Sequence, residues 1–159
     1  MKNYKLAIVG ATGVVGRTVL QVLQERNLPI SKYVFFASKK SAGKTIHFMG
    51  KDSLVQELTE SSFDEGFDYA IFSAGGSTSL KYAPIAVSKG CIVIDNSSAF
   101  RMEPNVPLVV PEVNPDVIKN HHGIIANPNC STIQAMPVLK PLEAVSYTHL
   151  RAHETKAKL

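Results

Sequence analysis

The sequence has little of what marks secreted, membrane-spanning or disulfide-rich proteins. Its 159 residues include only two cysteines, and no apolar run is long enough to cross a bilayer. No signal peptide is recognisable at the N-terminus. Together these absences predict a protein of a reducing, cytoplasmic setting that is not embedded in a membrane.

The excess of positive over negative charge is also small. The formal net charge is +4, but three cations against one carboxylate in residues 146–159 account for +2 of it. Lys and Arg form no stripe with interleaved aromatic residues. Binding to nucleic acid is therefore not predicted.

Clusters of metal ligands are missing as well. His121 and His122 have no further ligands at metal spacing, so we expect them to cap or follow a short helix over 115–120, and we predict no metal site. There are no internal repeats or low-complexity segments. With 45% hydrophobic and 19% charged residues, the composition is that of a globular domain with a sizeable core.

The N-terminus combines a strand, a glycine turn and a helix. The apolar run at 5–9 leads into GATGVVG and then into an apolar-periodic helix. Gly10 permits the tight turn, Gly13 lets the backbone approach a pyrophosphate, and Gly16 lets the helix pack closely on the strand. This GxxGxxG spacing is a variant of the GxGxxG fingerprint and predicts dinucleotide binding at the helix N-terminus. The alternative is a plain tight β–α turn.

The second strand, predicted over 33–37, bears on which dinucleotide binds. An Asp or Glu at the end of this strand would hold a ribose 2′-hydroxyl, and neither follows it. Instead the chain offers Ser38, Lys40 and Ser41, whose hydroxyl and ammonium groups suit a 2′-phosphate. The sequence therefore favours NADP over NAD, against the alternative of a solvated basic turn.

Further strands point the same way. A strand over 67–73 ends in a second glycine-serine turn over 74–79, which would reach the cofactor edge. A strand over 92–95 delivers polar side chains and Arg101 at its carboxyl end, where ligands bind in open parallel sheets. We expect Arg101 to bind an anion, with pairing to Glu103 or Glu112 as the alternative. The pattern predicts an α/β, Rossmann-like, doubly wound and mostly parallel sheet with helices on both faces.

The two cysteines differ in their surroundings. Cys91 begins an apolar segment and is most simply a core residue. Cys130 lies between a short strand over 124–126 and a predicted helix, in the polar stretch NPNCST. The backbone N–H groups and dipole of a helix N-terminus favour the thiolate, which is the nucleophile, and could hold an oxyanion. The alternative is a small buried hydrophobe.

Six motifs together give the chain a family resemblance. They are GATGVVG, SKKSAG, FSAGGS, DNSSAFRM, VPEVN and NPNCSTIQ, in this order between residue 5 and about residue 143. In this combination the chain resembles the N-terminal part of aspartate-semialdehyde dehydrogenase. The resemblance implies that Cys130 is the nucleophile, that Asn129 helps to seat the substrate and that Arg101 binds the phosphate or phosphoryl group.

The resemblance also implies a reaction and a cofactor. The enzyme would reduce L-aspartyl 4-phosphate to L-aspartate 4-semialdehyde with NADPH through a cysteine thioester, in the biosynthesis of lysine, methionine and threonine. It would act as a homodimer. We assign the cofactor site to Gly10, Thr12, Gly13, Val14, Val15, Gly16, Ser38, Lys40, Ser41, Ser73, Ala74, Gly75, Gly76 and Asn96.

The C-terminal stretch departs from the family. We expect an NADP-binding domain over 1–144 and interpret residues 145–159 as foreign sequence, of the kind that adapter or vector read-through joins to a truncated gene. In the family, a second domain supplies the acid/base histidine, a glutamine, the carboxylate-binding arginine and most of the dimer interface. The chain without them is expected to be inactive alone.

Three alternatives remain at the level of sequence. An N-acetyl-glutamyl-phosphate reductase shares the architecture, but its motif resembles NPGCY, and Asn129 argues against it. A glyceraldehyde-phosphate-type dehydrogenase would show an acidic residue after the second strand and a different cysteine context, and this chain shows neither. A noncatalytic NADP-binding or redox-sensing module would bind cofactor with an inert thiol.

Overall fold

The computed structural model describes residues 4–156, and it describes side chains as far as Glu143. In chain order the elements are β1 (Tyr4–Val9), α1 (Val14–Arg26), β2 (Ile30–Ala37), β3 (Thr45–Phe48), β4 (Lys51–Leu54), β5 (Gln56–Glu57), β6 (Tyr69–Phe72), α2 (Gly76–Ser88), β7 (Ile92–Asp95), the 3-10 helix η1 (Pro115–Asn120), β8 (Ile124–Ala126) and α3 (Cys130–Lys156).

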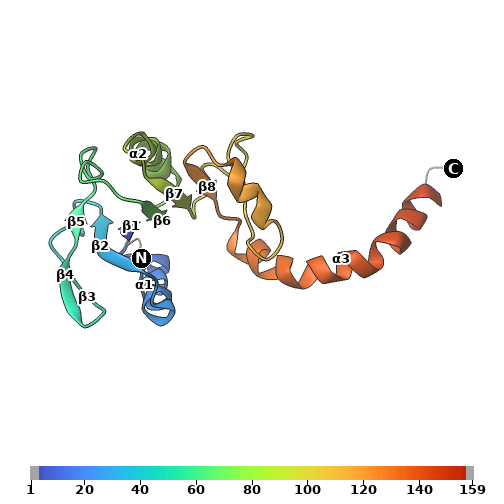
Figure 1. Cartoon of the computed structure of the whole chain (residues 1–159), viewed down its shortest axis with the longest axis horizontal. Helices are drawn as coiled ribbons and strands as arrows, with labels where there is room; N and C mark the ends of the chain where they lie inside the picture. The colour runs from blue at the N-terminus through green and yellow to red at the C-terminus, as the bar shows by residue number, and fades with distance from the viewer. Residues whose placement is uncertain (1–3, 157–159) are drawn as a thin grey trace.

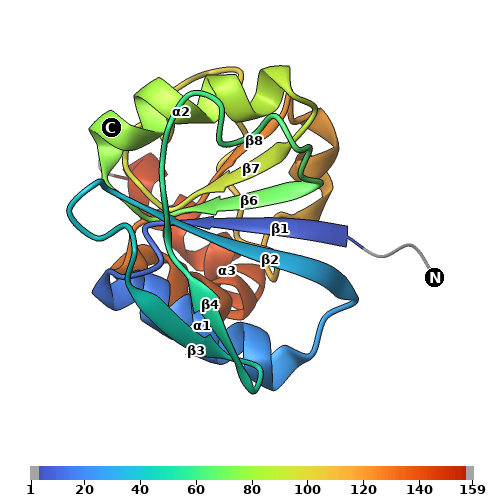
Figure 2. The same cartoon turned by 90° about the vertical axis from the view of Figure 1, so that its left-hand side faces the viewer.

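Six strands form one parallel sheet in the order β5-β2-β1-β6-β7-β8, and β3 and β4 form a separate antiparallel hairpin. The chain winds outward from β1 to β2 and β5, and then returns to β6 on the other side of β1. Helix α1 covers one face of the sheet and α2 covers the other (Figure 2). The predicted doubly wound, Rossmann-like fold is therefore confirmed, and its switch point lies between β1 and β6.

The central strands β1, β2, β6 and β7 carry mostly apolar residues toward their carboxyl ends, because both faces of the sheet are covered there. Successive side chains of β1 point to opposite faces and enter two separate cores. The α1 side contains Leu6, Ile8, Leu20, Leu23 and Phe35, and the α2 side contains Ala7, Val9, Phe36, Phe72, Ala83 and Ala86. This packing fixes the carboxyl ends of β1 and β6 side by side, and the register pairs Val9 with Phe72.

Several boundaries differ from those predicted. Helix α2 begins at Gly76, so the predicted turn over 74–79 is shorter and Ser79 is a buried helical residue. The reason is that glycine and serine tolerate the first turn of a helix whose backbone N–H groups need no intrahelical partner. Strands β3, β4 and β5 are not predicted from the sequence. The predicted helix over 115–120 is present as η1.

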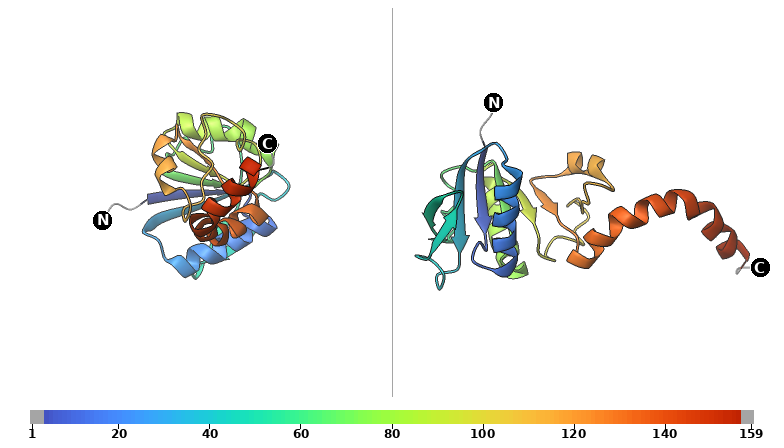
Figure 3. Two further views of the ribbon diagram at one scale, coloured as in Figure 1. Left: turned by 90° about the vertical axis from the view of Figure 1, so that its right-hand side faces the viewer. Right: turned by 90° about the horizontal axis from the view of Figure 1, so that it is seen from below.

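Helix α3 leaves the body of the sheet and projects away from it (Figures 1 and 3). The boundary between residues 144 and 145 that the sequence suggests falls inside this helix, whose backbone is continuous to Lys156. The side chains of that tail and residues 157–159 lie outside the described residues. In the part of the chain that is described, no helix has the length and apolar character needed to span a membrane.

Candidate functional site

The loop from β1 to α1 packs against the loop that follows β6, and glycine makes this approach possible. Gly10 has φ of 88°, and a Cβ added there would lie 2.5 Å from the carbonyl oxygen of Ser73. A Cβ on Gly16 would lie 2.2 Å from the carbonyl oxygen of Gly10. Backbone atoms therefore exclude side chains at these two positions. The two loops pack closely together, and we call this surface, which includes Gly10 and Ser73, the glycine floor.

The N-terminus of α1 faces this floor without a side-chain cap. Gly13 is the N-cap residue, no side chain bonds the first turn, and the turn contains no acidic residue. The first backbone N–H groups of the helix thus have no intrahelical acceptor, and the helix dipole adds partial positive charge at the same place. Helix α2 begins in the same way, with Gly75 as an N-cap that has no side chain. Such termini suit an anionic group such as a pyrophosphate.

A pocket of about 440 Å³ opens above the floor, at the switch point of the sheet. It is lined by Val9, Gly10, Thr12, Gly13, Ala37, Ser38, Lys39, Glu57, Leu58, Ser73, Ala74, Thr78 and Tyr82. The lining combines backbone of glycine turns, hydroxyl groups, one cation and one carboxylate. Its place and chemistry fit a nucleotide bound across the crevice between the strands.

The predicted cofactor residues fall into two groups. Gly10, Thr12, Gly13, Ser38, Ser73 and Ala74 line the pocket, whereas Val14, Val15, Gly16, Lys40, Ser41, Gly75, Gly76 and Asn96 do not. Ser38 begins a tight turn in which the N–H groups of Ser41 and Ala42 donate to its carbonyl oxygen at 2.8 and 3.0 Å. This turn directs Lys39 rather than Lys40 into the pocket lining.

The predicted cofactor residues do not include four polar side chains of the lining, namely Lys39, Glu57, Thr78 and Tyr82. Thr78 lies in the turn over 74–79 that is predicted to reach the cofactor edge, and Tyr82 lies one turn farther along α2, but the sequence singles out neither. Glu57 was hidden because β5 is a two-residue edge strand with no periodicity to detect. The register of β5 against β2 pairs Glu57 with Ala37, so a carboxylate stands at the carboxyl end of β2 after all.

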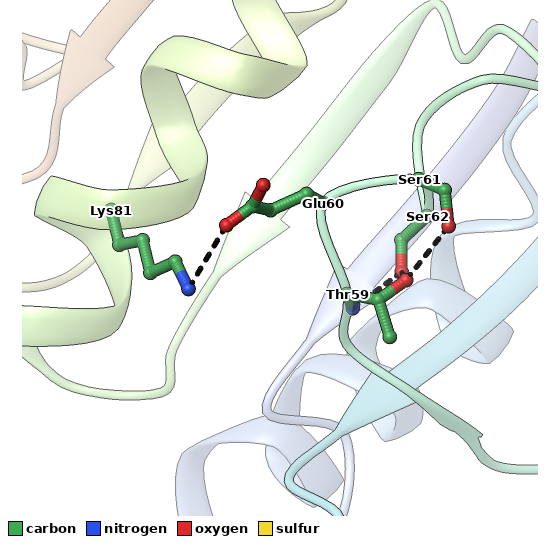
Figure 4. Close-up of polar contacts among 5 residues, drawn as sticks. All are labelled: Thr59, Glu60, Ser61, Ser62 and Lys81. Carbon is green, nitrogen blue, oxygen red and sulfur yellow. Dashed lines mark hydrogen bonds and ion pairs between the residues drawn. The ribbon is translucent and has the colours of Figure 1, made fainter.

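Beside the pocket, the loop after β5 contacts helix α2 (Figure 4). The hydroxyl of Ser62 accepts from the N–H of Thr59 at 2.8 Å, which folds the loop. Lys81 of α2 lies 3.2 Å from a carboxylate oxygen of Glu60. The hydrogen bond with Glu60 raises the pKa of Lys81 above its ordinary value, and the neighbouring Tyr82 adds to this shift.

A buried carboxylate organises the end of β7. Asp95 is completely buried, and its Oδ1 accepts from the hydroxyl of Ser79 on α2 at 2.6 Å. Its Oδ2 accepts from the hydroxyl of Ser97 at 2.7 Å. The N–H of Ser97 also donates to Oδ1 at 3.2 Å. These bonds satisfy the buried carboxylate and join the helix, the strand and the following loop.

Arg101 bridges the two loops that follow β7 and β8. Its Nε donates to the carbonyl oxygen of Asn127 at 2.9 Å, and its Nη2 donates to the carbonyl oxygen of Asn96 at 3.2 Å. Within the part of the chain that the structure describes, it forms no ion pair with Glu103 or Glu112. Two N–H bonds of the guanidinium fork are used by these carbonyls, which leaves the others for an anion.

Cys130 is the first residue of α3 and is exposed. The side-chain oxygen of Asn129 accepts from the N–H of Ser131 at 2.9 Å and so caps the helix. The Sγ of Cys130 lies 3.9 Å from the same oxygen. The predicted helix start at the cysteine is therefore correct, and the thiol is open to a reagent.

Cys91 has the opposite environment. It is 2% exposed within the core on the α2 side, as predicted. Burial raises the pKa of its thiol to about 12, and the charge of Asp68 contributes to the same shift. Its sulfur therefore stays protonated near neutral pH and is not a nucleophile there.

No cluster of three or more His, Cys, Asp or Glu side chains suited to a metal occurs among the residues that are described. His121 caps locally, because its Nδ1 accepts from the N–H of Gly123 at 3.0 Å.

Comparison with known proteins gives relatives over most of this chain. Residues 5–121 match the semialdehyde dehydrogenase NAD-binding domain. Aspartate-semialdehyde dehydrogenase of Aquifex aeolicus is 57% identical over 142 residues, which make up 88% of this chain and 42% of the relative. The protein of the same name from Campylobacter jejuni is 58% identical over 144 residues, 89% of this chain and 42% of the relative.

Solved structures give the same picture. Aspartate semialdehyde dehydrogenase II of Vibrio cholerae, complexed with ASA, has a TM-score of 0.81 at 49% identity, over 90% of this chain and 47% of that one. Aspartate semialdehyde dehydrogenase with NADP from Candida albicans has a TM-score of 0.76 at 28% identity, over 89% of this chain and 47% of that one. The chain therefore spans less than half the length of these relatives.

Proposed function

We propose a function for this chain, which belongs to the semialdehyde dehydrogenase family through its NAD-binding domain. We infer that it is the cofactor-binding part of an NADP-dependent aspartate-semialdehyde dehydrogenase, with Cys130 as the nucleophile. The observation that carries this proposal is the exposed thiol at the start of α3, at the same end of the sheet as the glycine-lined pocket.

The pocket residues fit a dinucleotide on structural grounds. The space where Cβ atoms of Gly10 and Gly16 would lie is occupied by backbone, so these glycines let the turn pack closely. The first N–H groups of α1, which have no side-chain cap, are available to a phosphate. Ser38 and Lys39 line the ribose end and favour a 2′-phosphate, and Lys40 and Ser41 follow in the same turn. When bound, the nicotinamide supplies the hydride that reduces an acyl group to an aldehyde.

The remaining steps fall to side chains of this chain. Cys130 attacks the acyl carbon of L-aspartyl 4-phosphate, so that a carbon–sulfur bond forms and the carbon–oxygen bond to phosphate breaks. Arg101 holds the departing phosphate, and Asn129 helps to seat the substrate. Reduction of the resulting thioester returns the thiolate and releases the semialdehyde.

The chain alone is proposed to bind the cofactor but to turn over slowly. The acid/base histidine and carboxylate-binding arginine belong, by the family resemblance, to a domain outside these 159 residues. Loss of acid–base help removes on the order of 10²–10⁴ in rate, and lost substrate positioning adds to this deficit. Residues 145–159 are proposed to lie outside the native domain.

The proposal is tested by calorimetric titration of the chain with NADP and with NAD, together with an assay of NADPH absorbance beside a full-length relative. Tighter binding of NADP and negligible turnover are expected. Protection of Cys130 against alkylation by an aspartyl-phosphate analogue would favour the enzyme over a noncatalytic redox module. Turnover within about tenfold of the relative would contradict the assigned role of the missing residues.

A further inference from the structure

Glu57 stands in the pocket beside the residues that favour a 2′-phosphate. Its strand pairs with the end of β2, and its side chain lines the pocket together with Ser38 and Lys39. Glu57 is exposed, and its carboxylate makes no hydrogen bond or ion pair with any residue that the structure describes. The charge of Glu57 is thus available to a ligand.

The backbone around Glu57 is fixed on both sides. The N–H of Leu58 donates to the carbonyl oxygen of Ala37 at 2.8 Å, which ties the end of β5 to the end of β2. The hydroxyl of Ser62 donates to the carbonyl oxygen of Glu57 at 3.3 Å. Nearby Glu60, in contrast, is paired with Lys81 (Figure 4). Among the described residues, the pocket lining therefore holds one unpaired carboxylate on a backbone that is fixed in place.

We propose that Glu57 is a specificity-determining residue that opposes Lys39 in the choice between NAD and NADP. This inference rests on the proposed function, since it assumes that the pocket binds a nicotinamide dinucleotide. A carboxylate at the carboxyl end of β2 accepts a hydrogen bond from a ribose 2′-hydroxyl. Toward a 2′-phosphate, which carries nearly two negative charges, the same carboxylate is repulsive.

The consequence is a cofactor preference set by two opposite charges. Lys39 attracts the phosphate and Glu57 repels it, so the pocket accepts NAD as well as NADP with a limited preference for the latter. Because both side chains are exposed, the balance depends on ionic strength and weakens in concentrated salt. A phosphate site built from cations and hydroxyls alone would exclude NAD more strongly.

The test is calorimetric titration of the full chain and of Glu57→Gln, Lys39→Gln and the control Glu143→Gln with NADP and NAD, at low salt and in concentrated salt. Glu143 is exposed on α3 and outside the pocket. Glu57→Gln should raise the ratio of NADP to NAD affinity about tenfold at low salt, and Lys39→Gln should lower it by a similar factor. Glu143→Gln should leave the ratio unchanged, and added salt should shrink both effects.

The outcomes separate two failures. An unchanged ratio in Glu57→Gln, while the original chain and the variant both bind a dinucleotide, would overturn this inference alone. Failure of the original chain to bind either dinucleotide would overturn the proposed function and this inference with it. Circular dichroism checks that the variants are folded, and loss of fold in Glu57→Gln would also count against a role confined to the pocket.

Discussion

Arg101 and Asn127 join the loops after two neighbouring strands, because the Nε of Arg101 donates to the carbonyl oxygen of Asn127 at 2.9 Å. The backbone N–H of Asn127 donates to the carbonyl oxygen of Asp95 at 2.8 Å, and its side-chain Nδ2 donates to Oδ1 of Asn96 at 2.7 Å. The segment that leads to Cys130 is thus fixed to the end of β7 by bonds in several directions. Arg101 has a positioning role in addition to its proposed contact with phosphate.

Replacing Arg101 by lysine should weaken this link. An ammonium group can reach one of the two backbone carbonyls but lacks the planar fork that bonds both. We expect Arg101→Lys to lower the free energy of unfolding by about 1–2 kcal/mol, measured by urea denaturation. Arg17→Lys, at an exposed position of α1, is the matched control and should have little effect. Equal effects of both changes would argue against the bridge.

Replacing Asp95 by alanine should lower the free energy of unfolding more than replacing it by asparagine. Asp95→Ala leaves the hydroxyls of Ser79 and Ser97 without their buried acceptor, so a loss of roughly 2–4 kcal/mol of unfolding free energy is expected. Asp95→Asn keeps one acceptor oxygen and should lose less, since the hydroxyl of Ser97 can accept from the new amide. Urea denaturation of both variants, beside exposed Asp116→Ala, measures the order. An Asn variant as unstable as the Ala variant would contradict it.

The two thiols should react at very different rates. Exposed Cys130 should be alkylated rapidly by iodoacetamide near neutral pH, whereas Cys91 should stay unmodified in the folded chain because its thiol is buried and protonated. Mass spectrometry assigns the labelled site, and Cys130→Ser should abolish the fast phase. Labelling of Cys91 at a comparable rate would show that its core opens readily.

The raised pKa of Cys91 also has a consequence for stability. The unfolded thiol loses its proton near the ordinary value of 9.0, and the folded thiol keeps it to about 12. The stabilisation is therefore present below pH 9.0 and is lost as the pH rises toward 12. The urea midpoint of the original chain should fall more steeply over this alkaline range than that of Cys91→Ala, and parallel curves would contradict the assignment.

Gly10 and Gly43 provide a matched pair for the glycine floor. Both have positive φ, 88° and 82°, but a Cβ on Gly10 would collide with Ser73, whereas nothing lies within 4 Å of one on Gly43. Gly43→Ala should cost about 1 kcal/mol from backbone strain, and Gly10→Ala should cost more and weaken NADP binding. Denaturation and calorimetry together measure both effects. Similar losses in the two variants would mean that strain, and not the contact, decides.

The sequence predicted the parts of the fold that carry periodic or glycine signals. The strand over 92–95, the switch from β1 to a glycine turn and the position of Cys130 at a helix start are confirmed, as is the family resemblance drawn from the six motifs. Each of these depends on local chain properties, namely apolar runs and turn residues.

The remaining features depend on tertiary packing. The entry of Glu57 into the pocket follows from the pairing of a two-residue strand, and the burial of Ser79 follows from its bond to Asp95, sixteen positions away. No local pattern encodes either contact. The roles of Arg101, Asn129 and the predicted cofactor residues stay predictions until binding is measured.

The length of helix α3 has a consequence for the position of Cys130. It contains 27 residues, which corresponds to about 40 Å along its axis, and it curves along its course with Pro137 and Pro141 inside it (Figure 1). Cys130 lies at the end that is joined to the sheet, through Asn127 and buried Pro128. A tilt about that end displaces the distant turns by many ångströms while the sulfur moves very little. The thiol is therefore the part of the helix that such a tilt would displace least.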